Sequence, residues 1–234
     1  EALFIGSMSP GRYTGQEHLG ALAADVLRLN NVPATRFEGA CASGALALRN
    51  AYISVASGRQ DVAIVLGAEK MTDVSGPEAI TSLAAAGDQE WEAAIGLTFA
   101  GLYALMARKH MHDYGTTREQ MAMVSVNNHK NGVANPWAQF RTPVTVKDVL
   151  TSSQVADPLR LLDCSPLTDG AAALILMSDN MAKKVDKPVW MLGTGQGSDS
   201  IALHDRTSYT EVIATKVAAK EALKDASVSM GGIN

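Results

Sequence analysis

The chain has 234 residues, a formal net charge of -4 and a pI near 5.7. This length allows one or two domains of roughly 150 residues each. Hydrophobic residues make up 47% and charged residues 19% of the chain, which is typical of a globular protein and argues against disorder or a coiled coil. The negative net charge provides no broad positive field for nucleic acid, and no apolar run reaches the roughly 18 residues of a membrane span.

The chain contains two cysteines, Cys41 and Cys164, which lie far apart and outside any CxxC pattern. This spacing disfavours a zinc cage and a secreted scaffold with several disulfides. The chain also opens with Glu1 and a short apolar run, which is not typical of a secretory signal. We therefore expect a cytoplasmic protein in which one cysteine is free for chemistry. The alternative, that both are small buried hydrophobic residues, stays open at this point.

The first 71 residues alternate between strand and helix patterns. Apolar runs predict buried strands at residues 2–6, 34–38 and 61–68, and helix formers predict helices at residues 16–30 and 42–57. A glycine, serine and proline loop is expected between the first strand and the first helix. Continuous apolar runs are typical of strands covered on both faces, so we expect a β-α-β unit in a sheet flanked by helices.

Residues 72–153 have a different character and include three of the five histidines. We interpret this stretch as an inserted helical region with helices at 100–114 and 118–131, the second opened by a capping box of Thr116 and Glu119.

Residues 169–178 are expected to return to the first sheet as a buried strand. Residues 189–194 and 211–225 are expected to form a strand and a helix that begin a second domain. Because the chain starts at a strand and stops in a glycine loop, we expect an opening β-α unit and most of the second domain to lie outside it.

Cys41 lies in the run F-E-G-A-C-A-S-G-A-L-A-L, between a predicted strand and the first turn of a predicted helix. Unpaired N–H groups and the positive end of the helix dipole stabilise a thiolate, so we expect the pKa of this thiol to fall below its reference of about 8.5. The same N–H groups can donate to a thioester oxygen, and the small neighbouring residues leave room for an acyl chain. A structural cysteine and a cysteine protease are the alternatives. The papain and caspase signatures are absent, however, and the histidine spacing identifies no base.

Four segments in chain order resemble thiolases. They are G-A-C-A-S-G at Cys41, L-G-A-E-K-M-T from Leu66, N-H-K-N-G with N-P-W-A-Q-F between Asn128 and Phe140, and D-C-S-P-L-T-D-G-A-A-A from Asp163. The resemblance extends over essentially all 234 residues and is nearest to archaeal acetyl-CoA acetyltransferases and sterol carrier protein X thiolases. It implies the five-layered α/β/α/β/α thiolase fold, in which two similar domains pack together and the first carries an inserted loop domain.

On this resemblance the chain divides into four segments. They are the first part of the N-terminal domain at 1–71, the loop domain at 72–153, the return of the N-terminal domain at 154–186 and the start of the C-terminal domain at 187–234. The resemblance also implies a homodimer, in which the strand before Cys41 pairs with its copy, and a dimer of dimers. For the archaeal subgroup it implies a complex with HMG-CoA synthase and a zinc-ribbon, OB-fold protein.

The family nucleophile corresponds to Cys41. It would accept acetyl from one acetyl-CoA, and the enolate of a second acetyl-CoA would then form acetoacetyl-CoA and CoA. Coenzyme A thioesters are the substrates, and no metal or redox cofactor is implied. The family's activating histidine and second cysteine belong to motifs downstream of Asn234. We expect an acetyl-CoA C-acetyltransferase that feeds the mevalonate pathway; a degradative 3-oxoacyl-CoA thiolase and a non-catalytic thiolase-like subunit are the alternatives.

The resemblance also assigns other residues. Cys164 matches no catalytic position and is interpreted as structural, and Asp169 and Gly170 are interpreted as a turn into the last strand of the first sheet. By rough alignment Thr194 and Gly195 lie near the thiolase pantetheine channel, which makes them candidate substrate contacts.

The remaining histidines do not point to a site. His204 precedes the helix that the family's histidine motif follows, so we do not assign it as the base. His129 and Lys130 are either contacts for a CoA phosphate or solvated residues at a helix end. His110 and His112 are two residues apart on a helix, face different directions and make a poor metal pair. The G-T-G-Q-G run from residue 193 lacks the GxGxxG spacing, so nucleotide binding is not expected.

Overall fold

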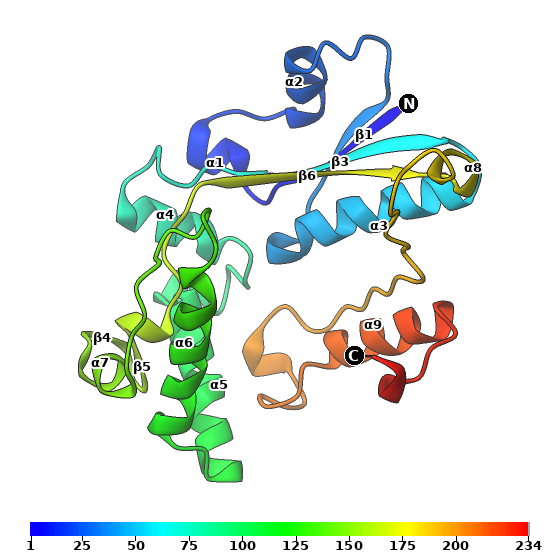
Figure 1. Cartoon of the computed structure of the whole chain (residues 1–234). Helices are drawn as coiled ribbons and strands as arrows, with labels where there is room; N and C mark the ends of the chain where they lie inside the picture. Colours follow the sequence, from blue (N-terminus) through cyan, green and yellow to red (C-terminus); the bar gives the residue numbers. More distant parts are fainter. Residues whose placement is uncertain (234) are drawn as a thin grey trace. The chain divides into compact units, whose positions relative to one another are not determined.

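The computed structural model describes residues 1–233 and forms two compact units (Figure 1). Unit 1 contains residues 1–82, 169–198 and the chain from 213 onward. Unit 2 contains residues 83–168 and 199–212. The chain therefore enters each unit more than once. The division into four segments at residues 71, 153 and 186 stays a prediction.

Unit 1 is built on a four-stranded sheet in the order β2-β1-β3-β6. The strands are β1 (Ala2–Gly6), β2 (Ala34–Phe37), β3 (Val62–Glu69) and β6 (Gly170–Met177). The first three are parallel, and β6 is antiparallel to β3. The predicted β-α-β unit is confirmed. The loops that follow β1, β2 and β3 all leave from one edge of this sheet, its carboxyl edge, where parallel α/β sheets place their sites.

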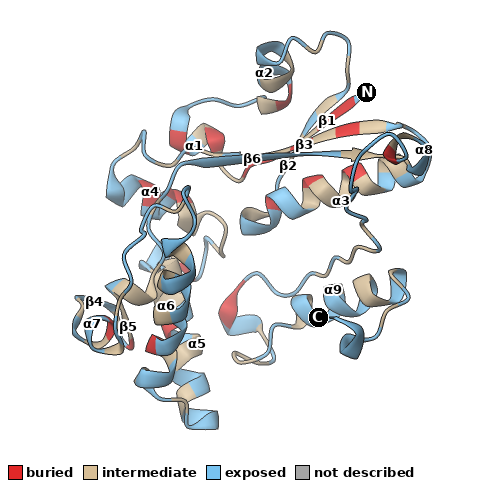
Figure 2. Ribbon diagram, in the orientation of Figure 1, coloured by how far each residue is buried: buried red, intermediate tan, exposed pale blue. Residues whose placement is uncertain are grey.

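The core of unit 1 lies between the sheet and helix α3 (Ser43–Ala56), which contacts all four strands (Figure 1). Ala47 and Ala51 on α3 are fully buried against Ala63 and Val65 of β3. Alanines at this spacing share one helix face and allow the helix to lie close to the strands. Figure 2 shows the buried residues of β1, β3 and α3 along this contact.

Helix α2 (Leu19–Val26) is shorter than the predicted helix at 16–30, and α1 (Pro10–Thr14) occupies part of the expected loop. The backbone explains the shorter helix. His18 and Arg28 have φ values of 56° and 55°, in the left-handed region, so neither can extend a right-handed helix.

Strand β6 corrects the expectation of a buried return strand. Its residues 170–175 are exposed, and Figure 2 shows them in pale blue. The return to the first sheet is confirmed, but β6 is an edge strand with β3 as its only neighbour in that sheet. The apolar run therefore predicted correctly that this segment is a strand, but not that most of its residues are exposed.

The strand predicted at residues 189–194 is not formed, although helix α9 (Ile213–Asp225) is confirmed. Residues 193–197 pass instead along α9. Side chains at Gly193, Gly195 and Gly197 would collide with its backbone at Ala222, Ala218 and Ala214. A strand needs a hydrogen-bonded neighbour, and the described chain provides none for this segment.

Unit 2 is mostly helical and includes α5 (Phe99–Tyr114) and α6 (Arg118–Val133), as predicted. The capping box of α6 is formed by Thr117 and Gln120, so the predicted pair of Thr116 and Glu119 is wrong by one residue. Thr116 Oγ1 instead lies 2.9 Å from His110 Nδ1. The remaining elements of the chain are α4 (Gly76–Ala84), α7 (Val146–Thr151), β4 (Gln154–Ala156), β5 (Leu159–Arg160), α8 (Asp179–Ala182), and the 3-10 turns η1 (Ala40–Ala42), η2 (Ala93–Ile95), η3 (Leu161–Asp163), η4 (Leu203–Asp205) and η5 (Met230–Gly232).

Within residues 1–233, no helix combines the length and the apolar character that crossing a membrane requires.

A close backbone contact of unit 1 occurs where the end of β1 meets the first turn of α3. A Cβ atom on Gly6 would lie 2.5 Å from backbone atoms of Ser43 and Gly44, which cannot move aside as a flexible side chain could. Gly67 is the partner of Gly6 on β3, and a Cβ atom there would meet nothing within 4 Å.

We predict that Gly6→Ala lowers the free energy of unfolding by about 2 kcal/mol or more, because the added methyl overpacks a backbone contact. Gly67→Ala is the matched control, since it makes the same change one strand away in open space. We expect it to stay within about 0.5 kcal/mol of the parent. Urea unfolding followed by circular dichroism measures both, and equal losses in the two variants would contradict this packing.

Candidate functional site

Cys41 lies on η1 (Ala40–Ala42), between β2 and α3, and its side chain is exposed. This is the strand-to-helix turn that the sequence predicted, and it lies at the carboxyl edge of the sheet. The first N–H groups of a helix have no partners within the helix. At this turn, however, the N–H groups of Ala42 and Ser43 donate to Gly39 O and Ala40 O, so the stabilisation of a thiolate here rests on the positive end of the α3 dipole.

The turn that presents Cys41 is held by short hydrogen bonds. Ala42 N–H donates to Gly39 O over 2.9 Å, and the Ser43 hydroxyl accepts from Gly39 N–H over 3.0 Å. Ser43 also donates to Ala40 O over 2.6 Å, and Ala40 N–H donates to Glu38 Oε1 over 2.6 Å. Every one of these groups lies within three residues of Cys41, so the turn is braced locally.

Glu69, at the end of β3, anchors the loop that follows β1. Its carboxylate accepts from Met8 N–H over 2.6 Å, from Ser9 N–H over 3.3 Å and from the Ser7 hydroxyl over 3.3 Å. Sequence reasoning quoted Glu69 within a motif but gave it no role. The sequence contained one signal for this role, because Glu69 places a carboxylate at the end of an apolar strand, where it can face a neighbouring loop.

Tyr13 lies in α1, within this anchored region, and is 1% exposed. Burial raises the pKa of its hydroxyl, and the negative charges of Glu69 and of a Cys41 thiolate raise it further. Its oxygen has no hydrogen-bond partner among the described residues.

Asp169, directly before β6, anchors the loop that follows β3. Its carboxylate accepts from Met71 N–H over 2.7 Å, from Thr72 N–H over 3.1 Å and from the Thr72 hydroxyl over 2.6 Å. These hydrogen bonds, that of the Thr72 hydroxyl foremost, lower the pKa of the Asp169 carboxyl. The predicted strand is confirmed and begins at Gly170, whereas Asp169 lies in the irregular segment before it and no turn is assigned at these two residues.

Of the five histidines, His18 belongs to unit 1, which contains Cys41, and the other four belong to unit 2. His204 Nδ1 lies 3.2 Å from Glu92 Oε1, and this carboxylate also accepts from the N–H groups of Leu203 and His204. Glu92 is 4% exposed, so this contact is part of the packing of unit 2.

The other three histidines have local contacts within unit 2. His129 Nδ1 lies 3.2 Å from Thr142 O, and His112 Nδ1 lies 3.0 Å from Asp113 Oδ1. His110 contacts Thr116 and the Tyr114 ring. Within residues 1–233, no group of three or more His, Cys, Asp or Glu side chains is arranged to hold a metal ion.

Thr194 and Gly195, the predicted substrate contacts, lie in the segment that passes along α9. Thr194 N–H donates to Asp225 Oδ2 over 3.0 Å, and Gln196 N–H donates to Glu221 Oε2 over 2.7 Å. Asp225 thus satisfies the backbone donor of Thr194, and a side chain at Gly195 would collide with the backbone of Ala218 on α9. Contact of either residue with substrate stays a prediction.

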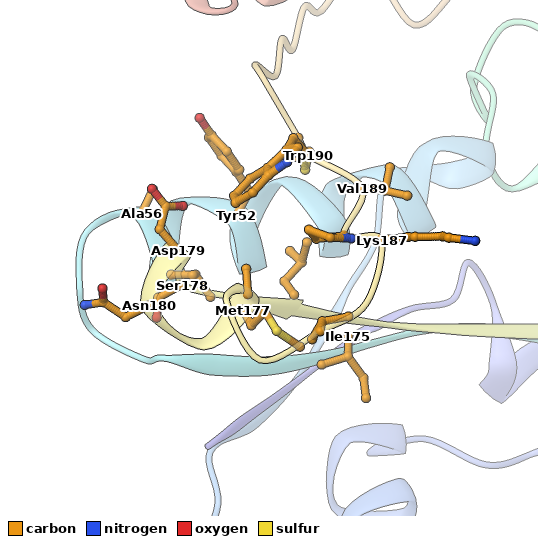
Figure 3. A pocket seen from close by; sticks show the side chains of 16 residues that line it. Tyr52, Ala56, Ile175, Met177, Ser178, Asp179, Asn180, Lys187, Val189 and Trp190 are labelled. Carbon is orange, nitrogen blue, oxygen red and sulfur yellow. The ribbon is translucent and has the colours of Figure 1, made fainter.

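A hollow of unit 1 with a volume of about 660 Å³ is lined by the last turns of α3, the end of β6 and residues 187–191 (Figure 3). Tyr52, Lys187, Val189 and Trp190 border it. Because β6 runs antiparallel to β3, this hollow lies at the opposite edge of the sheet from Cys41. It is therefore not the place where an acyl group on Cys41 would lie.

We predict that Cys41 is alkylated about tenfold or more faster than Cys164 at neutral pH. Cys41 is exposed, whereas Cys164 is half-buried, and burial together with the Asp163 charge raises the pKa of its thiol. A raised pKa means less thiolate at pH 7, so the labelling of Cys164 should increase only at alkaline pH. Brief iodoacetamide treatment and peptide mass spectrometry measure both sites. Faster labelling of Cys164 would overturn the assignment.

Comparison with known proteins places this geometry in a family. A family model described as the N-terminal domain of thiolase matches residues 1–180. An acetyl-CoA acetyltransferase of Methanothermobacter thermautotrophicus is 53% identical over 235 residues, which cover 100% of this chain and 61% of that protein. An acetyl-CoA acetyltransferase of Methanocaldococcus jannaschii is 49% identical over 231 residues, which cover 97% of this chain and 58% of that protein.

Among solved structures, the Ltp2-ChsH2(DUF35) aldolase superposes with a TM-score of 0.81 at 23% identity, over 98% of this chain and 59% of that chain. At this identity the likeness concerns the fold alone. The present chain thus spans about three fifths of the length of the relatives it matches. The match to the family model and the identity to two acetyl-CoA acetyltransferases show that this chain belongs to the thiolase family, with the α/β fold of its N-terminal domain.

Proposed function

We propose that the protein to which this chain belongs is an acetyl-CoA C-acetyltransferase with Cys41 as its nucleophile. The observation that carries the proposal is the exposed thiol of Cys41 on the turn between β2 and α3, in a chain 53% identical to an acetyl-CoA acetyltransferase. A free thiol at a helix start suits acyl transfer, because the backbone stabilises both the thiolate and the oxyanion.

The reaction then takes two steps. The Cys41 thiolate attacks the carbonyl carbon of acetyl-CoA, the carbonyl oxygen becomes an oxyanion that accepts from N–H groups, and CoA leaves as its thiolate and takes up a proton. In the second step the α-carbon of another acetyl-CoA loses a proton and attacks the acetyl-enzyme. The new C–C bond gives acetoacetyl-CoA, and the Cys41 thiolate is released.

Proton transfer in both steps needs a base, and the one histidine of unit 1, His18, lies at the start of α2. We assign this work to the histidine and second cysteine that the family carries downstream of Asn234. The relatives extend beyond the part matched here, which leaves room for such motifs. Thr194 and Gly195 remain candidate contacts for the pantetheine arm.

The synthetic direction, supply of acetoacetyl-CoA to the mevalonate pathway in the cytoplasm, is part of this proposal. Two relatives are named acetyl-CoA acetyltransferases, which supports acetyl-CoA as the substrate. The degradative alternative, thiolysis of longer 3-oxoacyl-CoA, would show itself as a higher kcat/KM for such substrates than for acetoacetyl-CoA.

The partners are also proposals. β2 forms one edge of the sheet and is free to pair with a second copy across a two-fold axis. A homodimer, or a dimer of dimers, follows. The complex with HMG-CoA synthase and a zinc-ribbon, OB-fold protein rests on the resemblance. The Ltp2-ChsH2(DUF35) aldolase, a structure with a similar fold, supports it only in that its name includes a second component.

We predict that mixing the protein with [14C]acetyl-CoA, followed by acid quenching, traps one acetyl group on Cys41. Cys41→Ser should lose this label, and its kcat should fall by about a thousandfold or more, because the catalytic unit loses its nucleophile. Cys164→Ser is the matched control and should keep both the label and the rate. Label on Cys164, or full activity of Cys41→Ser, would contradict the proposal.

The dimer can be tested at single amides. Leu3 N–H donates to Pro33 O and Ser7 N–H donates to Phe37 O, so the alternation along β2 leaves the Arg36 N–H directed away from β1. Light scattering should give a dimer or tetramer mass. Hydrogen exchange at Arg36 should be slow in that assembly and become fast on dilution to the monomer. A monomer at micromolar concentration would contradict the pairing.

A further inference from the structure

Ala40, the residue directly before Cys41, has a left-handed backbone. Its φ is 50°, whereas residues with a Cβ atom seldom have positive φ, and non-glycine residues in this region persist only where the surroundings hold them. Such strain is concentrated at functional sites. Neighbouring groups must therefore hold Ala40 in this conformation.

Both backbone polar groups of Ala40 are held by side chains, and Ala40 O also accepts from the backbone N–H of Ser43. The Glu38 carboxylate accepts from Ala40 N–H over 2.6 Å, and the Ser43 hydroxyl donates to Ala40 O over 2.6 Å. Ser43 is 4% exposed and also accepts from Gly39 N–H over 3.0 Å. Glu38 is exposed, so water competes with its contact and Ser43 is the stronger brace.

Ser43 is itself fixed by the fold. Its carbonyl carbon lies where a Cβ atom on Gly6 would approach to 2.5 Å, so the end of β1 packs directly on its backbone. The sheet thus fixes Ser43, Ser43 fixes the Ala40 carbonyl, and that carbonyl belongs to the peptide that leads into Cys41. A change of Ala40 to an ordinary backbone conformation would rotate this peptide and redirect the thiol.

We propose that Ser43 and Glu38 are positioning residues, which hold Ala40 in its left-handed conformation so that the Cys41 thiol is presented at the carboxyl edge of the sheet. The effect on catalysis rests on the proposed function, whereas the effect on thiol reactivity does not. Neither side chain touches a reacting atom in this account.

The test compares the alkylation rate of Cys41 by iodoacetamide, without substrate, with kcat and KM for acetoacetyl-CoA cleavage in the intact protein. Ser43→Ala should lower the alkylation rate and kcat by about tenfold each, with KM changed by less than about twofold, because orientation is lost and binding is not. Glu38→Gln should lower the alkylation rate and kcat by only about threefold, since the amide oxygen of glutamine still accepts the hydrogen bond.

Rescue separates positioning from general support of the fold. Glycine adopts the left-handed conformation without steric cost, so Ala40→Gly added to Ser43→Ala should return the alkylation rate to within about threefold of the parent. Two control variants should leave both rates unchanged. Ser82→Ala removes the hydroxyl of another buried serine, and Ser227→Gly relieves another left-handed residue, with φ of 54°.

Two results would overturn the inference. One is a parental alkylation rate in Ser43→Ala, and the other is a loss that Ala40→Gly does not recover. If Ser43→Ala does not fold, the pair Glu38→Ala and Glu38→Ala/Ala40→Gly decides the matter with Ser43 intact, because Glu38→Ala removes the acceptor of the Ala40 N–H and should lower the alkylation rate by more than Glu38→Gln does. A rescue of alkylation in a protein without acetyl transfer would support the positioning role and contradict the proposed function.

Discussion

The contact between Gly6 and the first turn of α3 is the constraint on which the candidate site depends. Backbone meets backbone there, with no side chain between β1 and the turn at Ser43 and Gly44. The buried alanines Ala47 and Ala51 continue this close approach along the helix. Because α3 cannot slide or rise without breaking these contacts, Cys41 occupies one place relative to the sheet, as a precise catalytic geometry requires.

Carboxylates complete the site by anchoring the loops around this turn. Glu69 holds the loop after β1, and Asp169 holds the loop after β3. Each accepts two backbone N–H groups and one hydroxyl, which is a strong and directional arrangement. The sheet provides a rigid base, and loops fixed in this way can carry function without adding mobility.

The local sequence patterns correctly predicted the features that depend on residues close together in the sequence. The apolar runs predicted β1, β2 and β3, and the position of Cys41 at a strand-to-helix turn followed from the same reading. These patterns gave wrong expectations where the structure depends on residues that are distant in the sequence. Exposure of β6 depends on which layer covers it, and the extended segment at residues 189–194 lacks a paired strand. Glu69 and Ser43 were not singled out, because their partners are fixed by tertiary contacts and by a turn conformation that spacing does not show.

The central claim is that the α3 turn makes Cys41 the acyl carrier, and a crystal structure of the protein frozen after exposure to acetyl-CoA tests it most directly. The account predicts electron density for an acetyl group on Cys41 Sγ, with its carbonyl oxygen directed at backbone N–H groups. The left-handed conformation of Ala40 should be retained. An acetyl group on Cys164, or intact acetyl-CoA bound at the opposite edge of the sheet with Cys41 unmodified, would contradict it.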